Sequence, residues 1–368
     1  MSYTKVTTSN LLIDLVTKKK STLQLEKSEW CDVVALSRQL GFLPFLYHIS
    51  REENTFSLMP KSVASQLKSA YYELLKQHDS INWHLAQLRK NNPSSLKITL
   101  LKGAAYIAAG KRNAAYRLLS DIDLLVERKF LNDAEFWLFI NGFAVSVSDE
   151  YDDYYYRQWM HELPPFVNSK SGLIVDLHHN LLPISSKRHI NASLIVDSGI
   201  ELEDNFIVPS DEDLIIHSAV HLIQDSVFDR SLRDLCDQYW LLTDYIEQNI
   251  TSEQLIDRAI KLALGTDLAK SFSLMSEVLN LPLTDEESDF VKQSLRRKRL
   301  WALEKKCYII MLHQPVKSEW KVKHHVASLY LFVKSHLIKM PVKLLIKHAG
   351  MKSYKRIIGL FKKQEKGS

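Results

Sequence analysis

The sequence contains few cysteines and no long apolar segment. Its three cysteines, Cys31, Cys236 and Cys307, lie far apart and form no C-x-x-C pair. This spacing argues against a disulfide framework and a cysteine-ligated zinc site, and it fits a reducing compartment. The first ten residues lack the basic segment and apolar stretch of a secretory signal, and no uncharged apolar run approaches the ~18 residues that span a bilayer. We therefore expect a cytoplasmic protein.

Glycine and proline are also sparse, with ten of each among 368 residues. Apolar residues make up 46% of the chain and charged residues 25%. These proportions are typical of a globular protein and exclude a collagen-like or disordered chain. A chain of this length is expected to form roughly two to three domains and to bury a sizeable core without covalent crosslinks.

Acidic residues are scarce at the C-terminal end of the chain. Residues 316–368 contain 13 lysines and arginines but only 2 acidic residues, a net charge of +11, whereas the whole chain carries +5. The preceding residues therefore have a net charge of −6. Because extensive contact with nucleic acid needs basic residues spread over the body of a protein, nucleic acid is the weaker expectation for a partner.

Hydrophobic spacing divides the chain into two helical regions around a shorter mixed segment. A 3.6-residue apolar spacing predicts helices over residues 1–92 and again from Asp211 onward, with Ser210 as an N-cap. Between them, an α+β fold with a small mixed sheet is expected from a predicted helix at 131–140 and from β-compatible runs. These runs are 97–101, 121–126, 143–147, 166–168 and 173–178. The expected divisions are an N-terminal helical region (1–95), an α/β core (96–182), a helical domain (183–315) and a basic amphipathic arm (316–368).

Acidic residues interrupt two of the predicted strands. Asp121 and Asp123 stand two residues apart in one strand, so their side chains project from the same face. Asp176 interrupts the apolar run from Leu173 to His178, where an unpaired carboxylate would be costly. Divalent ions such as Mg²⁺ relieve repulsion between carboxylates, and three carboxylates on adjacent strands would form a two-metal site. For Asp121 and Asp123 alone, a solvated strand edge is the alternative interpretation.

A Lys-Gly pair, Lys102-Gly103, lies between the first predicted strand and the helix that follows it. A glycine at this place lets backbone N–H groups approach a phosphate at a helix N-terminus. An ordinary strand–helix turn is the alternative, but the glycine precedes Asp121 by only 18 residues. The sequence therefore places a candidate phosphate contact near the candidate metal ligands.

The order of these motifs resembles the polymerase-β-type nucleotidyltransferase superfamily, and more narrowly a bacterial family described as uncharacterised nucleotidyltransferases. The matching segments are Leu101 to Gly103, Arg117 to Val126 and Val175 to His178, which together span about 80 residues. The chain departs from the wider superfamily at Ala104, where many members carry a serine after the glycine. That departure removes a hydroxyl group that could hold the triphosphate.

This resemblance implies that a nucleoside monophosphate is transferred from a nucleoside triphosphate to a hydroxyl acceptor. Asp121, Asp123 and Asp176 would be the catalytic and metal-binding residues, with two Mg²⁺ ions, or Mn²⁺, as cofactors. The implied phosphate-binding residues are Lys102, Gly103, Arg117 and Ser120. For Arg117, a structural ion pair with Asp121 is the alternative.

The resemblance also places a His-Glu pair near the rim of this site. His161 and Glu162 could contact the acceptor, as could His178, which shares a strand face with Asp176. A structural histidine is the alternative for His178. A second pair, His217 and His221, has a helical spacing that can bind zinc, but the sequence offers no third ligand nearby and favours core packing.

The basic arm combines lysines with apolar residues. Residues 325–348 interleave the two kinds of residue, Pro341 should break or kink any helix there, and a second apolar segment at 357–361 has basic flanks. This pattern suits an anionic membrane surface, which would place the protein peripherally at the inner face of the membrane. A helix docked on the body with a solvated basic tail is the alternative.

Three functional hypotheses follow. The leading hypothesis is a cytoplasmic nucleotidyltransferase that acts on a small molecule, a glycan precursor or a protein hydroxyl. The first alternative is a catalytically degenerate NTP-binding regulatory protein. The second is a toxin- or defence-type enzyme that modifies tRNA or a partner protein, although the acidic body disfavours extensive RNA contact.

Overall fold

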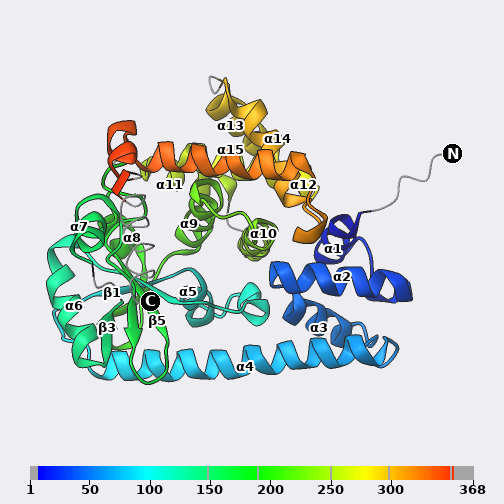
Figure 1. Ribbon diagram of the computed structural model, residues 1–368, viewed down its shortest axis with the longest axis horizontal. Helices are drawn as coiled ribbons and strands as arrows, with labels where there is room; N and C mark the ends of the chain where they lie inside the picture. The colour runs from blue at the N-terminus through cyan, green and yellow to red at the C-terminus, as the bar shows by residue number, and fades with distance from the viewer. Residues whose placement is uncertain are drawn as a thin grey trace, which may run out of the picture.

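A mixed β-sheet lies at one end of the molecule, and helices form the rest (Figure 1). The computed structural model describes residues 7–146, 149–188, 190–248, 251–296, 299–348 and 350–351. The α+β fold with helical regions on both sides of the sheet is therefore confirmed. The domain boundaries stay a prediction, and the sheet includes two strands that come after residue 182.

The sheet has seven strands within the described residues, in the order β3-β4-β5-β2-β1-β7-β6. Strand β2 pairs with β1 in antiparallel and with β5 in parallel orientation, and β1 is parallel to β7. The β2–β5 register places Asp123 opposite Asp176. The strands are β1 Ile98–Leu101, β2 Ile122–Leu125, β3 Phe143–Val145, β4 Phe166–Asn168, β5 Ile174–His178, β6 Ile200–Glu201 and β7 Phe206–Val208.

The N-terminal region is helical, as predicted. Helix α2 ends at Gly41, which adopts a left-handed conformation with φ +83° and lets the chain turn into the next helix. Helix α4 is the longest of the region and runs along one edge of the molecule to the sheet (Figure 1). The elements are α1 Thr8–Val16, the 3₁₀ turn η1 Thr22–Gln24, α2 Lys27–Leu40, α3 Leu43–Glu52 and α4 Lys61–Lys90.

Short helices connect the strands. The helix predicted at residues 131–140 is confirmed as α6, and the runs predicted at 166–168 and 173–178 are confirmed as the antiparallel strands β4 and β5. The connecting elements are α5 Lys102–Ala108, η2 Arg112–Tyr116, η3 Arg128–Phe130, α6 Leu131–Ile140, α7 Glu150–Trp159, α8 Ser193–Ser198 and η4 Glu203–Asn205.

The C-terminal region is helical from Asp211, and the predicted cap is confirmed because the Ser210 hydroxyl accepts a hydrogen bond from the backbone N–H of Asp213 at 3.3 Å. Helix α15 ends at Lys339, before Pro341, and the apolar segment predicted at 357–361 lies outside the described residues. The elements are α9 Asp211–Gln224, α10 Ser231–Glu247, α11 Ser252–Lys261, α12 Gly265–Val278, α13 Asp285–Leu295, α14 Trp301–Leu312, η5 Lys317–Glu319 and α15 Val322–Lys339.

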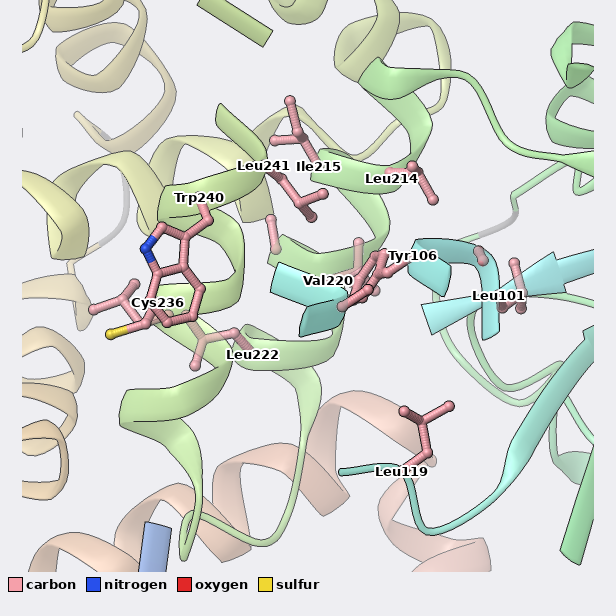
Figure 2. Packing of buried hydrophobic residues seen from close by; sticks show 14 of the residues in the cluster. Leu101, Tyr106, Leu119, Leu214, Ile215, Val220, Leu222, Cys236, Trp240 and Leu241 are labelled. Atoms are coloured by element: carbon pink, nitrogen blue, oxygen red, sulfur yellow. The ribbon is translucent and has the colours of Figure 1, made fainter. Parts of the chain in front are cut away.

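A hydrophobic core joins the sheet to helices α9 and α10 (Figure 2). Leu101 from β1, Tyr106 from α5 and Leu119 from the loop before β2 belong to the same buried cluster as residues of both helices. Because burying one such side chain contributes about 1.5–3 kcal/mol, this contact fixes α9 and α10 against the end of the sheet. The helical residues drawn there are Leu214, Ile215, Val220, Leu222, Cys236, Trp240 and Leu241.

Within the described ranges, every helix is too short or too polar to cross a bilayer.

Candidate active site

Strands β2 and β5 bring the three predicted aspartates together. Asp123 and Asp176 are partners in the parallel register, and Asp121 directly precedes β2 on the same face as Asp123. The charges of Asp123 and Asp121 both reach Asp176 and raise its pKa, which shows that the three carboxylates share one environment. Their role as metal ligands stays a prediction, but the convergence that it requires is present.

Asp123 is the most enclosed of the three. It is only 2% exposed, and its Oδ1 accepts hydrogen bonds from Lys102 Nζ at 2.6 Å and from His178 Nε2 at 2.9 Å. Burial alone would raise the pKa of Asp123, but the Lys102 ammonium and the His178 ring lower it well below its usual range. The carboxylate is therefore ionised at any ordinary pH, and two cationic side chains balance it.

Asp176 is in the opposite situation. Burial raises its pKa to about 7, and the charges of Asp123, Glu162 and Asp121 add to this effect. Its Oδ1 atom is buried and has no hydrogen-bond partner among the described residues. A buried carboxylate oxygen without a partner, beside further carboxylates, is a poor arrangement for the protein alone and suits a bound divalent cation. The residues present thus fit a Mg²⁺ or Mn²⁺ site.

The turn between β1 and α5 is held by packing. Lys102, and not the glycine after it, has the left-handed backbone conformation, with φ +45°. At Gly103 an added Cβ would lie 2.6 Å from Leu119 Cγ, so that position has no room for a side chain. The turn therefore aims the Lys102 side chain at Asp123 while Gly103 lets the loop before β2 pack closely. Contacts of either residue with phosphate stay a prediction.

Arg117 is engaged with helix α10. Its guanidinium forms an ion pair with Asp237, lies 3.6 Å from Asp234 and sits over the Tyr106 ring at 5.7 Å. The alternative of a structural pair with Asp121 is wrong, because the arginine points to α10 instead. Its predicted contact with phosphate is not tested by this geometry, but the guanidinium already has anionic partners.

Helix α4 holds the loop that carries Arg117 and Ser120. The Gln77 side chain accepts a hydrogen bond from the Leu119 N–H at 2.7 Å and donates one to the Leu119 carbonyl, while His78 Nε2 donates to the Arg117 carbonyl at 3.1 Å. Ser120 Oγ donates to Asp121 at 3.0 Å. Sequence reasoning missed Gln77 and His78, since they look like ordinary surface residues of an amphipathic helix about 40 positions away.

The predicted acceptor residues lie beside Asp176. Residues 161–163 pair with the end of β5, with the Leu163 N–H donating to the Leu177 carbonyl at 2.9 Å. Burial lowers the pKa of His161 well below its usual value. Burial also lowers the pKa of His178, but its hydrogen bond to Asp123 and the charge of Glu162 outweigh this and raise it overall. His178 is thus hydrogen-bonded to Asp123 within the site, which agrees with either an acceptor contact or the structural alternative.

Helix α9 carries His217 and His221 close to this site. Burial lowers the pKa of His217 well below its usual value, in agreement with core packing. The expectation that no further ligand lies near His221 is wrong, because ligand atoms of His221, Asp225 and Asp234 all lie within 4.8 Å of one another. Asp234, however, is already paired with Arg233 at 3.1 Å, so its charge is balanced.

Comparison with known proteins agrees with this arrangement. The family model described as "Uncharacterised nucleotidyltransferase" matches residues 26–280, which is more than half of the chain. The matched range includes α4 and α10, the two helices that hold the Arg117 loop, as well as the strands with the aspartates. No curated protein and no solved structure matches the chain. The chain belongs to the uncharacterised nucleotidyltransferase family.

Proposed function

We propose that the protein transfers a nucleoside monophosphate from an NTP to a hydroxyl group of a small molecule, a glycan precursor or a protein. The observation that carries this proposal is the convergence of Asp121, Asp123 and Asp176 with one buried carboxylate oxygen left without a partner among the residues that the structure describes. Family membership supports the reaction class. The acidic body of the protein supports a small or proteinaceous acceptor over nucleic acid.

In this proposal, Asp121, Asp123 and Asp176 hold two divalent ions, Mg²⁺ or Mn²⁺. Such ions, when bound, neutralise phosphate charge and lower the pKa of a coordinated hydroxyl. Lys102 balances Asp123 in their absence, since its ammonium lies 2.6 Å from that carboxylate. Once divalent ions bind Asp123, the flexible side chain of Lys102 is long enough to contact the nucleotide phosphates instead.

The proposed reaction is a single displacement at phosphorus. The acceptor oxygen forms a bond to the α-phosphorus, the bond from that phosphorus to the oxygen bridging the β-phosphate breaks, and pyrophosphate leaves. The hydroxyl proton passes to the carboxylate of Asp176. Lys102, Ser120, Arg117 and the backbone at Gly103 contact the phosphates and offset the charge that develops on the leaving group.

The acceptor enters from the side of residues 161–163 and the end of β5. This placement is supported by the pairing of that segment with β5, which sets Glu162 opposite His178 and both beside Asp176. In the proposal, His161, Glu162 and His178 position the acceptor hydroxyl near the α-phosphate.

The decisive experiment follows the label from radioactive ATP, CTP, GTP and UTP in the presence of Mg²⁺ and a cell extract. We expect one nucleotide to label a discrete product, and Asp121→Asn or Asp176→Asn to abolish the labelling. The matched control is Asp133→Asn, the same chemical change at an exposed position of α6. Full labelling by either active-site variant would contradict the proposal.

The same experiment separates the alternatives. Tight NTP binding without any labelled product would favour a degenerate regulatory protein. Label that appears in tRNA, together with a shifted tRNA band in a gel, would favour a toxin- or defence-type enzyme. The three carboxylates support turnover, whereas the alanine after Gly103 leaves one phosphate contact fewer than in many relatives of the superfamily.

A second proposal concerns the surface of α15, which we propose contacts an anionic membrane. The helix is docked through Ala327, Leu331 and Ser335, as the alternative interpretation of the arm predicts, but its opposite face is apolar and exposed. Lys321 and Lys323 are exposed at the start of the helix, and the arm of residues 316–368 carries the net charge of +11. The exposed apolar residues are Val322, Val326, Leu329, Val333 and Leu337.

Vesicle co-sedimentation tests this contact. The intact protein should pellet with anionic vesicles and not with neutral ones, and the double variant Val326→Glu/Leu329→Glu should remain in the supernatant. No pelleting at low salt, where attraction to anionic lipid is strongest, would contradict it.

A further inference from the structure

A second set of ligand atoms converges beside the three aspartates. Glu162 Oε2 lies 3.5 Å from His178 Nδ1 and 3.8 Å from His161 Nε2. The ligand atoms of these three residues all lie within 4.8 Å of one another. Backbone pairing between residues 161–163 and β5 fixes the arrangement, because it sets Glu162 opposite His178.

The distances fit a bound ion better than hydrogen bonds. A charge-assisted N–H···O bond measures about 2.7–2.9 Å, and both separations from Glu162 are clearly longer. Two ligands at about 2.0–2.2 Å from one tetrahedral ion lie roughly 3.4 Å apart, which is close to the observed separations. The three side chains thus stand at the spacing of metal ligands.

The hydrogen bond at the far side of the His178 ring supports this interpretation. His178 Nε2 lies 2.9 Å from Asp123 Oδ1 and donates to it, so Nδ1 is the ring atom left to face Glu162, at 3.5 Å. A divalent cation bound at Nδ1 would take the place of the proton on that atom. Histidine ligands of metals usually donate their other N–H to a carboxylate in this way, which fixes the orientation of the ring.

Burial and charge also favour a cation here. His178 is only 2% exposed, and His161 Nε2, the ring atom that faces Glu162, lies 3.8 Å from the carboxylate, too far for a hydrogen bond. Carboxylates outnumber ammonium groups around the cluster, since Asp121, Asp123 and Asp176 share the environment of Glu162 while Lys102 and Lys339 are the lysines that act on His161. The local charge is therefore negative when all these groups are ionised.

We propose that His161, Glu162 and His178 bind one divalent transition-metal ion, of the class of Zn²⁺ or Co²⁺, at a site separate from the aspartates. Imidazole ligands suit such ions, whereas Mg²⁺ prefers oxygen ligands throughout. Three protein ligands leave one coordination position for water or for the acceptor hydroxyl. That last role rests on the proposed transferase reaction, but binding of the metal does not.

The test uses Co²⁺ as a spectroscopic probe on the intact, chelator-treated protein without NTP. We expect one Co²⁺ per chain with the strong visible absorption of a four-coordinate ion, displaced by Zn²⁺. His161→Ala and the conservative Glu162→Gln should each weaken binding by more than about 100-fold, since loss of even an outer-shell partner costs 10–100-fold. Circular dichroism and the unfolding midpoint of each variant, measured without metal, establish that it is folded.

Two variants serve as controls that should retain the signal. His48→Ala removes a histidine from an exposed His–Glu pair, with His48 Nε2 3.1 Å from Glu52. His221→Ala removes the histidine of the neighbouring His-Asp-Asp cluster. Loss of the signal in either control would overturn the assignment.

Two further outcomes would overturn the proposal, and a third would leave it standing. Equal binding by wild-type protein and His161→Ala, or loss of the signal in Asp176→Asn with retention in His161→Ala, would place the ion on the aspartates. A chain that transfers no nucleotide but loses Co²⁺ on Glu162→Gln would leave the metal site standing and contradict only the transferase proposal. The two proposals can therefore fail independently.

Discussion

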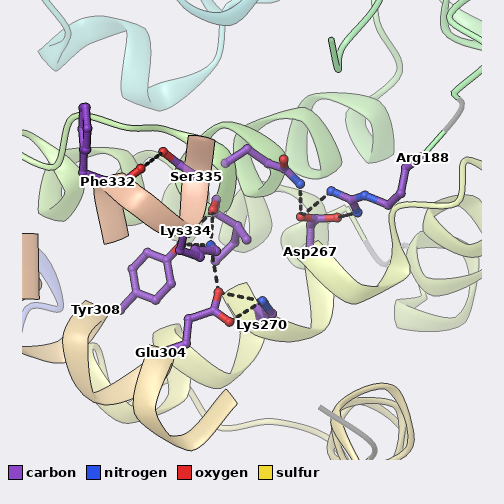
Figure 3. Close-up of polar contacts among 10 residues, drawn as sticks. Arg188, Asp267, Lys270, Glu304, Tyr308, Phe332, Lys334 and Ser335 are labelled. Carbon is purple, nitrogen blue, oxygen red and sulfur yellow. Dashed lines mark hydrogen bonds and ion pairs between the residues drawn. The ribbon is translucent and has the colours of Figure 1, made fainter. Parts of the chain in front are cut away.

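Two of the regions in which the protein buries charged groups treat these groups differently. Between α12, α14 and α15, Glu304 accepts hydrogen bonds from Lys270 at 2.6 and 2.8 Å and lies 2.8 Å from Lys334 (Figure 3). Lys334 also donates to the Tyr308 hydroxyl and to the Ile223 carbonyl, each at 2.8 Å. Both oxygens of Glu304 thus have partners within the protein.

In the paired part of β2 and β5 that holds Asp123, Asp176 and His178, called the strand ends below, the carboxylates are not matched in this way. Asp123 has two cationic partners, but the Oδ1 atom of its register partner Asp176 has no hydrogen bond among the described residues. Nearby, His161 Nδ1 is also buried without a partner in the described part of the chain. The strand ends therefore hold polar atoms that the surrounding protein leaves unmatched.

The difference separates two uses of buried charge. A closed network holds elements together, since removing one member leaves an uncompensated charge in a low-dielectric interior. A cluster with unpaired polar atoms is less stable by itself, and a ligand that pairs with those atoms lowers its free energy. The helical region with Glu304 is therefore expected to respond to mutation through stability, and the strand ends to respond through binding and activity.

The largest effect on stability is expected from Glu304→Gln. This change leaves Lys270 and Lys334 buried without a counter-charge, and breaking a buried pair in this way typically costs about 3–5 kcal/mol. Burial already lowers the pKa of Lys334 to about 8 beside Glu304, so part of the loss is met by deprotonation of this lysine. Urea-induced unfolding, with free energies extrapolated to water, measures the change.

The chain offers a matched control on the same two helices. Glu277 of α12 pairs with Lys305 of α14, but the Glu277 side chain is 46% exposed and that of Glu304 only 8%. Glu277→Gln should change the free energy of unfolding by less than about 1 kcal/mol, as exposed pairs do. Equal effects of the two variants would show that burial does not set the response of this network.

The second prediction concerns packing at the active site, where one carboxylate oxygen lacks a partner but Gly103 packs closely against Leu119. Gly103→Ala places a Cβ 2.6 Å from Leu119 Cγ and should destabilise the protein by about 1–3 kcal/mol, the usual cost of overpacking. The double variant Gly103→Ala/Leu119→Ala should recover part of this loss in a double-mutant cycle. Additive effects of the two substitutions would mean that this contact does not explain the glycine.

The same contrast explains which features the sequence alone can predict. The strands that carry Asp121, Asp123 and Asp176 follow local apolar and acidic patterns, so sequence reasoning finds them. The clamp by Gln77 on Leu119 and the ion pair of Arg117 with Asp237 join residues far apart in the chain, and no local pattern reveals them. They depend on the tertiary arrangement of α4 and α10.

Sequence reasoning also misses two short strands. Strands β6 and β7 lie within residues 183–315, which are expected from the sequence to form a helical domain, and neither is long enough to show a clear alternation of apolar and polar residues. The sequence groups Lys334 with the basic arm, yet its ammonium is buried against Glu304. Composition gives the sign of the net charge of a segment, but it does not tell which of the charged side chains are buried.

The smallest expected effect has the opposite sign. In the folded protein the pKa of Asp176 is raised from 3.8 to about 7, so its ionisation disfavours the fold, and this penalty develops as the pH rises from about 4 to 7. Asp176→Asn removes the penalty and should stabilise the metal-free protein at pH 7.5 by about 1–2 kcal/mol, with no gain at pH 4. Chemical unfolding of both proteins at the two pH values measures the difference. Mg²⁺ at 100 times its Kd should reverse the order, because it binds the wild-type carboxylates and adds about 2.7 kcal/mol, while the asparagine variant gains less. A variant that is less stable than wild type without metal would show that Asp176 has a structural partner, and the strand ends would then resemble the closed network around Glu304.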